Sequence, residues 1–328
     1  MLSCLRWLIA IILAVADTAD AQTTSTGSGP GYPAKAVRVI VPFPAGGGLD
    51  ITARAFGQKL GEYWNQSVVI ENRPGASGMI GAEAVAHAPK DGYTLLICSP
   101  AEIALNPALY ARMSYDPFKE LAPITLAATY PNMIVVHVSV PVKTVKELIA
   151  LSKKTPGGLP FGSSGTGSTQ HLAGEWLKRN AGINFLHVPY KGAAPATTDL
   201  VGGQIPTAIL GLAPIIPHIK SGRIRGIAVT SARRSSAAPE IPTLHEAGID
   251  FESTQWFGFL APAGTPADVI AKVQAGVKRV TADAGVKERL ISLGGDPISS
   301  TPDEFAAFIR AENAKYAKVI KDANIKAE

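Results

Sequence analysis

The stretch Val39–Phe56, VIVPFPAGGGLDITARAF, sets the pattern from which the fold of this 328-residue chain can be inferred. An apolar run breaks at two prolines and three consecutive glycines, and apolar residues then recur with helical spacing. We predict a strand, VRVIVPF, then a glycine-rich turn, then a helix over Leu49–Glu62. Glycines let a ligand approach the backbone closely, and the start of a helix offers unpaired N–H groups and the positive end of its dipole. The turn therefore suits an anion.

The same strand–turn–helix pattern recurs in two series along the chain. The first series continues with the strand QSVVIEN, a helix over Gly78–His87 and the strand YTLLICS. The second begins with the helix VKTVKELIALSKK, and helices then alternate with the strands LPFGSS, INFLHVPY, IPTAILG and IRGIAVTS. These helices are expected over Ser168–Asn180, Ala193–Gly202 and Ile215–Ser221. Near-continuous apolar strands between helices are typical of a parallel sheet covered on both faces.

Two extended stretches connect the two series. They are PITLAATYPNMIVVHV, which follows an irregular proline-containing segment over 106–123, and FESTQWFGFLAPAGTP, which precedes three C-terminal helices. The chain is also longer than the roughly 250–300 residues at which one hydrophobic core stops growing. We therefore predict an α/β protein of two lobes, each a sheet flanked by helices, joined by two crossing strands with a cleft between the lobes. The first lobe is expected over 35–127 and 256–328 and the second over 128–255.

The first residues have the pattern of a secretory signal peptide. Arg6 precedes a ten-residue apolar run, Trp7–Ala16, and Ala19-Asp20-Ala21 follows, which predicts cleavage after Ala21. An uncleaved anchor is disfavoured because spanning a bilayer takes about 20 apolar residues. Residues 22–34, rich in Gly, Ser, Thr and Pro, are expected to form a flexible leader. The remaining chain has only Cys98 and no intramolecular disulfide, which suits a bacterial periplasm.

A second glycine-rich turn, FGSSGTGSTQHL, follows a strand of the second series at Phe161–Leu172. Because the two turns occupy equivalent places in the two series, we predict a ligand clamped between them, outside the carboxyl ends of the strands. Each turn also has a simpler explanation, in which glycine only makes the turn and Ser168 only caps its helix. Asp50 is expected to satisfy the first turn of its helix, since a bare carboxylate would repel an anion. His171 can either face the cleft or pack behind it.

The sequence lacks the motifs of several other functional classes. Lysine and arginine are scattered, which argues against nucleic acid. The segment Gly46–Ile51 fails G-x-G-x-x-G at its last position, and no phosphate-binding loop of the G-x-x-x-x-G-K-[ST] type occurs. There is no H-E-x-x-H, the spacing at Gly162–Gly165 is wrong for a nucleophile elbow, and the six histidines show no metal-type pairing. We predict a binding protein without metal or cofactor, not an enzyme. A secreted hydrolase that uses His171 and the serine-rich turn, and a ligand sensor, stay open as alternatives.

Several motifs together resemble the solute receptors of tripartite tricarboxylate transporters, also called Bug proteins. They include VRVIVPFPAGGGLDITAR, ENRPGASG, GSSGTGSTQHLAGE, HVPYKG, DLVGGQI and WFGFLAPAGTP, and the resemblance covers nearly all of the mature chain. It implies a periplasmic two-lobe binding protein, expected to act as a monomer, that closes on a small organic carboxylate and delivers it to membrane permease subunits. It also implies that the turns at Phe43–Gly47 and Ser163–Ser168 hold the ligand carboxylate, partly through ordered water.

The chain departs from this family after GGQI, where many relatives carry acidic residues and a Met-Phe pair. Here the segment Pro206–Gly211 has no acid, and no carboxylate occurs between Asp199 and Glu240. A ligand ammonium would lack a partner, so a carboxylate with an aliphatic or aromatic body is expected, in contact with this strand. The candidate ligand-binding residues are Phe43, Ala45, Gly46, Gly47, Asp50, Ser99, Ser163, Ser164, Gly165, Thr166, Ser168, His171, Tyr190, Ala208 and Leu210.

Overall fold

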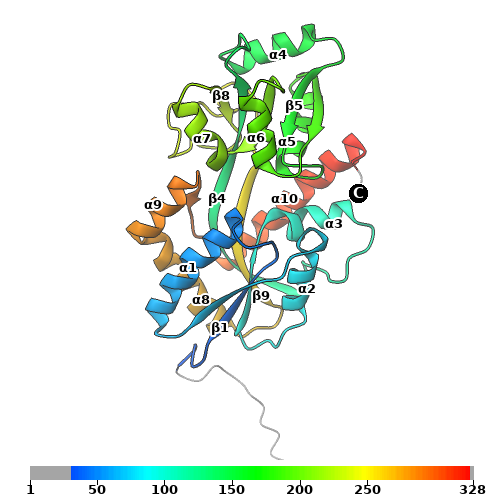
Figure 1. Ribbon diagram of the computed structural model, residues 1–328. Coiled ribbons are helices and arrows are strands. Elements are labelled where there is room, and N and C mark those ends of the chain that lie inside the picture. Colours follow the sequence, from blue (N-terminus) through cyan, green and yellow to red (C-terminus); the bar gives the residue numbers. More distant parts are fainter. Residues whose placement is uncertain (1–30, 326–328) are drawn as a thin grey trace, which may run out of the picture.

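A computed structural model describes residues 31–325 as two lobes that share a continuous path of strands (Figure 1). The strands are β1 (Val37–Val41), β2 (Val68–Asn72), β3 (Thr94–Cys98), β4 (Leu121–His137), β5 (Leu159–Ser163), β6 (Phe185–Pro189), β7 (Thr207–Gly211), β8 (Ile224–Val229), β9 (Thr254–Pro262) and β10 (Asp296–Pro297). Their order is β2-β1-β3-β9-β4-β7-β5-β6, and β8 and β10 pair with β4 off this path. The predicted α/β fold of two lobes is confirmed.

Helices cover both faces of each half of the sheet. They are α1 (Gly48–Trp64), α2 (Met79–Ala86), α3 (Asn106–Leu109), α4 (Val145–Lys154), α5 (Thr169–Asn180), α6 (Ala193–Val201), α7 (Leu212–Lys220), α8 (Ala267–Ala282), α9 (Ala284–Ser292) and α10 (Pro302–Ala323), together with the 3-10 turn η1 (Ala76–Gly78) and the π-helix η2 (Ala101–Leu105). No helix among residues 31–325 combines the length and apolar character needed to span a membrane.

Strand β4 passes from one lobe into the other. Its first part, Leu121–Pro131, pairs antiparallel with β9, and its last part, Asn132–His137, pairs with β7 and β8. The parallel strands of the first lobe, β1, β2 and β3, join this crossing strand through β9. The predicted irregular segment 106–123 therefore ends in a long strand, and its first residues form α3.

Each central strand contributes side chains to two cores, because successive residues of a strand point to opposite faces. Val39 of β1 packs with α1, α8 and α9, whereas its neighbour Ile40 packs with α2 and α10. In the second lobe, Ile209 of β7 joins the core under α4 and α5, and Leu210 joins the core under α6 and α7. This two-sided burial explains why the strands read as nearly continuous apolar runs.

Two predicted helix boundaries differ from the structure for identifiable reasons. The helix expected from Gly78 begins at Met79, because Gly78 has a φ of 87°, outside the helical range. The helix expected from Ile215 begins earlier, at Leu212. Pro214 lies in its first turn, where the missing N–H has no helical acceptor to lose, so the proline is tolerated.

The C-terminal helix α10 contacts both lobes. Its first turns place Phe305 and Ile309 in a core of the first lobe, and its last turns place Tyr316 and Ile320 against Leu172 of α5 in the second lobe. The position of α10 between the lobes is visible in Figure 1. The lobe boundaries at residues 127 and 256 remain predictions.

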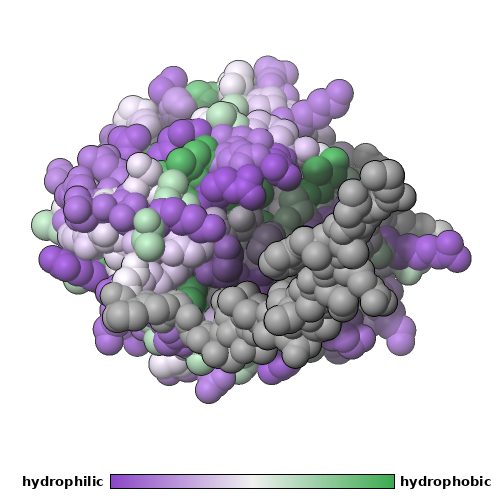
Figure 2. Space-filling model, turned by 90° about the horizontal axis from the view of Figure 1, so that it is seen from below, coloured by the Kyte–Doolittle hydropathy of each residue, from purple (hydrophilic) through white to green (hydrophobic). Residues whose placement is uncertain are grey.

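The N-terminal predictions lie mostly outside the described residues, including the signal peptide and its cleavage after Ala21. Of the predicted flexible leader, only residues 31–34 are described, and they are attached to the first lobe. The Tyr32 hydroxyl donates to the carbonyl of Gly92 at 2.7 Å, and the Ala34 N–H donates to the Tyr93 hydroxyl at 2.9 Å. Seen from below, the surface of the described residues is mostly hydrophilic, with hydrophobic side chains in small separate patches (Figure 2).

Candidate functional site

Two adjoining cavities lie in the cleft between the lobes. The larger has a volume of about 1150 Å³ and includes the turn at residues 43–48, the start of α1, and residues of β4, β7 and β9. The smaller has a volume of about 510 Å³ and lies between η2 and α3 of the first lobe and residues 165–168 of the second. Phe43 and Lys191 line both cavities. The two glycine-rich turns therefore face adjoining compartments of one cleft.

The first turn leaves the start of α1 open to the larger cavity. Gly47 precedes the helix and no side chain caps it, and the first helical hydrogen bond runs from the Ile51 N–H to the Gly47 carbonyl at 2.9 Å. The N–H groups of Gly48 and Leu49 have no partner among residues 31–325. Gly46 adopts a φ of 84°, which favours glycine. Unpaired N–H groups at the start of a 17-residue helix form a site for an anion.

The buried carboxylate of Asp50 holds this turn in place through hydrogen bonds. Its carboxylate accepts from the Gly46 N–H at 2.9 Å, from Asn72 Nδ2 at 3.0 Å and from Arg54 Nε at 3.0 Å, and Arg54 Nη2 lies 2.9 Å from Oδ1. Burial alone would raise the pKa of Asp50, but the hydrogen bonds from Arg54, Gly46 and Asn72 outweigh it and hold the pKa below its ordinary value. The sequence predicted that Asp50 satisfies the first turn of its own helix. Its side chain instead reaches back and accepts from the Gly46 N–H in the loop before the helix.

The second turn is supported by two stacked histidines. Ser163 Oγ lies 2.7 Å from His187 Nε2, the rings of His187 and His171 are parallel with centroids 3.8 Å apart, and His171 Nδ1 accepts from the Gly167 N–H at 3.1 Å. Burial lowers the pKa of His171 to about 3, helped by the neighbouring His187, and burial lowers the pKa of His187 to about 4. Both rings are therefore neutral at physiological pH. Neither Ser163 nor His171 lines the cavities, so the packing alternative for His171 describes its place in the structure.

Ser168 has the capping geometry that the simpler explanation of the turn required. Its hydroxyl accepts from the His171 N–H at 3.2 Å and donates to the Gly165 carbonyl at 2.7 Å. It nevertheless lines the smaller cavity together with Gly165 and Thr166, whereas Ser164 does not. Capping and ligand contact are therefore compatible at this position.

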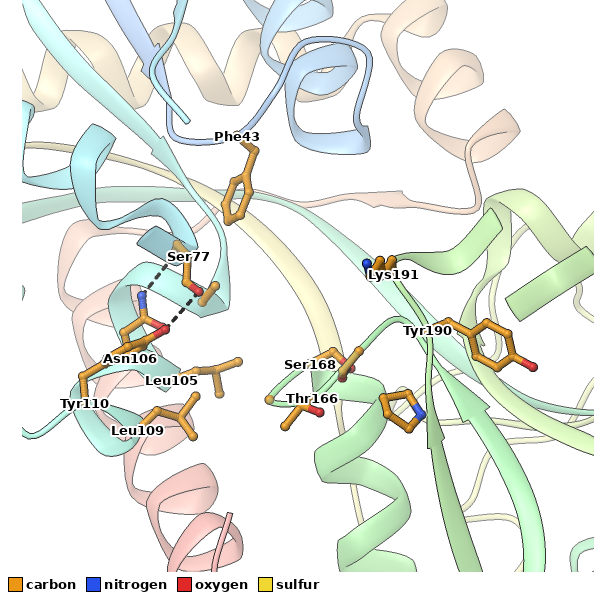
Figure 3. A pocket seen from close by; sticks show the side chains of 14 residues that line it. Phe43, Ser77, Leu105, Asn106, Leu109, Tyr110, Thr166, Ser168, Tyr190 and Lys191 are labelled. Atoms are coloured by element: carbon orange, nitrogen blue, oxygen red, sulfur yellow. Dashed lines mark hydrogen bonds between the residues drawn. The ribbon is translucent and has the colours of Figure 1, made fainter. Parts of the chain in front are cut away.

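Ala208 and Leu210 do not form a wall of the cleft, contrary to the prediction. Both side chains are fully buried in the core under α6 and α7, and neither lines a cavity. The reason is that β7 is an interior strand with both faces covered, so only Gly211 at its end reaches the larger cavity. Tyr190 does line the smaller cavity, but its hydroxyl donates to Asp199 Oδ2 at 2.8 Å and turns away from the space (Figure 3).

Ser99 lines the larger cavity with its hydrogen-bonding groups already engaged. Its N–H and hydroxyl donate to the carboxyl oxygens of Glu102 at 2.5 and 2.7 Å. Glu102 lies on the π-helix η2 and is fully buried, and burial raises its pKa to about 8 against the opposing bonds from Ser99. Glu102 thus positions the end of β3, where it forms part of the cleft.

Several polar residues of the cleft were missed. Asn132, Gln170 and Gln255 line the larger cavity, and Gln170 Nε2 donates to Asn132 Oδ1 at 2.9 Å. The smaller cavity has Ser77, Asn106 and Tyr110 on its first-lobe side, and Figure 3 shows them opposite Thr166 and Ser168. Asn132 directly precedes the apolar run Met133–Val136 of β4, a signal that was visible in the sequence. The others come from separate segments that only the tertiary fold brings together.

Lys191 was also missed, although it stands in the motif HVPYKG. Of the predicted site residues, Phe43, Ala45, Gly46, Gly47, Asp50 and Ser99 line the larger cavity, and Phe43, Gly165, Thr166, Ser168 and Tyr190 line the smaller one. Among the described residues, no group of three or more His, Cys, Asp or Glu is placed to hold a metal ion.

Comparison with known proteins gives consistent matches over most of the chain. A family model described as "Tripartite tricarboxylate transporter family receptor" matches residues 52–325. Protein BugT of Bordetella pertussis is 33% identical over 321 residues, which cover 97% of each chain. The solved structure of R. palustris Rpa4515 with adipate has a TM-score of 0.78 and 37% identity, covering 90% of this chain and 99% of that one. The structure of MatC from Rhodopseudomonas palustris with bound malate has a TM-score of 0.73 and 29% identity, covering 88% of this chain and 100% of that one.

Proposed function

The chain belongs to the tripartite tricarboxylate transporter receptor family, and from this premise we propose that it captures a small organic carboxylate in the periplasm and hands it unchanged to membrane permease subunits. The observation that carries the proposal is the uncapped start of α1. The unbonded N–H groups of Gly48 and Leu49 open into a cavity of about 1150 Å³. They suit a ligand carboxylate because the helix dipole adds to their hydrogen bonds.

The larger cavity also suits the rest of a carboxylate ligand. Amide side chains of Asn132, Gln170 and Gln255 provide polar contacts, while Phe257 and Leu212 provide apolar surface. Asp50 is the only acidic residue among the described residues that line the two cavities, and Arg54 already neutralises it. An amino-acid ligand would therefore find no free carboxylate for its ammonium. This supports a carboxylate without an amino group, on grounds independent of Ala208 and Leu210.

A capture function agrees better with the serine–histidine geometry than hydrolysis does. Ser163 and His187 are within hydrogen-bond distance of one another, as a nucleophile and its base would be. Ser163, however, is fully buried and lies outside the lining of both cavities. Ser168, which does line the cleft, donates its proton to a backbone carbonyl, and its hydroxyl bonds no side-chain base among the residues that the structure describes. The relatives solved with adipate and malate are consistent with a carboxylate receptor.

The experiment places a negative charge where the ligand carboxylate is expected. A Cβ at Gly48 would meet only Phe257 Cζ, at 4.0 Å, so both Gly48→Ala and Gly48→Asp fit, and aspartate at a helix start does not destabilise it. Calorimetry with adipate as the probe should show near wild-type binding by Gly48→Ala and at least a tenfold loss in Gly48→Asp. Equal binding by the two variants would contradict the proposed carboxylate position. To test the hydrolase alternative, an ester probe, monomethyl adipate, is incubated with the protein: mass spectrometry should show it unchanged, whereas release of adipate and methanol would favour a hydrolase.

A further inference from the structure

Lys191 is a cation at the meeting point of the two cavities. It lies in the loop between β6 and α6, and its exposed side chain lines both compartments. Figure 3 shows it between Phe43 and Tyr190, across the cleft from the first lobe. Among residues 31–325 it has no hydrogen-bond or ion-pair partner. Its ammonium group is therefore free to bind a ligand.

The charge balance of the cleft leaves Lys191 uncompensated. Among the described residues that line the two cavities, only Asp50 and Lys191 carry a full charge. The Asp50 carboxylate is buried and bonded to the Gly46 N–H, Asn72 and Arg54, and its charge is neutralised by Arg54, which lines neither cavity. A concave site lined by one sign of charge concentrates the opposite ion. The cleft therefore attracts anions through Lys191 in addition to the helix start.

The two anion-binding features belong to different lobes. The start of α1 is in the first lobe and opens into the larger cavity, while Lys191 is in the second lobe and reaches both. An anion with one charged end can satisfy one of these features, and an anion with two charged ends can satisfy both. The flexible four-carbon stem of lysine lets its ammonium follow second groups at different distances.

We propose that Lys191 is the specificity-determining residue that selects dicarboxylates over monocarboxylates of the same length. The inference rests on the proposed function, because it assigns the first carboxylate to the start of α1. The second carboxylate then binds the Lys191 ammonium from the opposite lobe, so a two-ended anion links the lobes as it binds. A monocarboxylate makes the first contact and leaves Lys191 in water.

The test compares two probes of equal chain length, adipate and hexanoate, by calorimetry on the full exported chain. Lys191→Met removes the charge while keeping the length, and Lys191→Arg keeps the charge. Lys220→Met, at the exposed end of α7 in the same lobe and outside both cavities, is the matched control. We expect Lys191→Met to lose about tenfold or more in adipate affinity and less than about twofold in hexanoate affinity. Lys191→Arg and Lys220→Met should keep the wild-type preference.

Salt gives an independent readout. Raising the ionic strength from 0.1 to 1 M shortens the screening length from about 10 to about 3 Å, so the wild-type preference for adipate should narrow. The preference of Lys191→Met should not change with salt. Equal losses for both probes in Lys191→Met, or an adipate preference that survives the substitution, would overturn the role of Lys191 and leave the proposed function standing. If the wild type bound neither adipate nor hexanoate, both the proposed function and the role of Lys191 would be overturned.

Discussion

Replacing Asp50 with asparagine should destabilise the first lobe and weaken ligand binding without removing any ligand contact. Each carboxylate oxygen of Asp50 accepts two donors: Oδ1 from Asn72 and Arg54, and Oδ2 from the Gly46 N–H and Arg54. Asparagine keeps one acceptor and turns an NH2 group toward two donors. Hydrogen bonds to charged groups contribute about 1.5–3 kcal/mol each, and the half-exposed Arg54 places its share at the lower end. The expected loss is about 2–4 kcal/mol of unfolding free energy.

Thermal unfolding and calorimetry measure the two effects separately. With an unfolding entropy of about 0.6 kcal/mol/K for about 300 residues, the loss corresponds to a Tm lower by about 3–6 °C. Release of Gly46 leaves one backbone residue to be ordered on binding, at about 1–2 kcal/mol, so the Kd for adipate should rise about tenfold. Because hydrogen bonds hold the pKa of Asp50 below its ordinary value near 3.8, its contribution is present above that pH. The difference between wild type and Asp50→Asn should shrink as the pH falls through the folded value.

Asp322→Asn is the control, since its ion pair with Lys318 is exposed at the end of α10. That substitution should change stability by less than about 0.5 kcal/mol and leave binding unchanged. If Asp50→Asn had the same Tm as the Asp322→Asn control and the same adipate affinity as the wild type, Asp50 would have no part in organising the turn.

Three further substitutions test the supports of the cleft. Ser168→Ala should lower the unfolding free energy by about 1 kcal/mol, because it removes the cap of α5. It should also weaken adipate binding, because Ser168 lines the smaller cavity. A lower Tm with unchanged affinity in calorimetry would restrict Ser168 to capping. The stability of Glu102→Gln relative to wild type should rise by about 1.4 kcal/mol per pH unit from pH 6 toward pH 8, because burial raises the folded pKa of Glu102 to about 8, so the wild-type chain, ionised when unfolded, must take up a proton to fold. Denaturant titrations giving a pH-independent difference would contradict a buried protonated Glu102. Wild-type stability should fall by about 4 kcal/mol at pH 5, about 2 kcal/mol each through His171 and His187, whose pKa values of about 3 and about 4 keep them neutral when folded while the unfolded chain takes up protons below about 6.5. His187→Gln should remove about half of this loss of stability, and an unchanged loss would rule His187 out as a contributor.

The sequence predicted the architecture well because the signals for strands and helices are local. Alternating apolar runs and glycine-rich turns identified the two series of elements, and the first turn at Gly46 and Gly47 lies where it was expected. Which side of a strand faces a cavity is not local, and this limited the prediction of the site. Leu210 was assigned to the cleft, but sheet order makes β7 an interior strand with both faces buried.

Polar side chains were harder still to assign from the sequence. A serine in a glycine-rich turn can bind a ligand or the protein itself, and Ser163 bonds a histidine 24 residues away. His187 was not part of the predicted site, because only the pairing of β5 with β6 brings it next to that serine. Lys191 was visible inside a motif, but its proposed role depends on its having no bonding partner among residues 31–325, which only the tertiary structure reveals.

The late position of β9 in the chain has a consequence for the order of folding. In the first lobe, β9 lies between β3 and β4, so the sheet stays in two pieces until Thr254–Pro262 has joined it. Helix α8 and then α10 are needed to finish the two cores on its faces. A chain that emerges from its N-terminus first therefore cannot complete this lobe until its last quarter is available. For a protein proposed to cross a membrane before it folds, this delay keeps the translocating chain extended, and shortening the C-terminus would expose the open edges of β3 and β4.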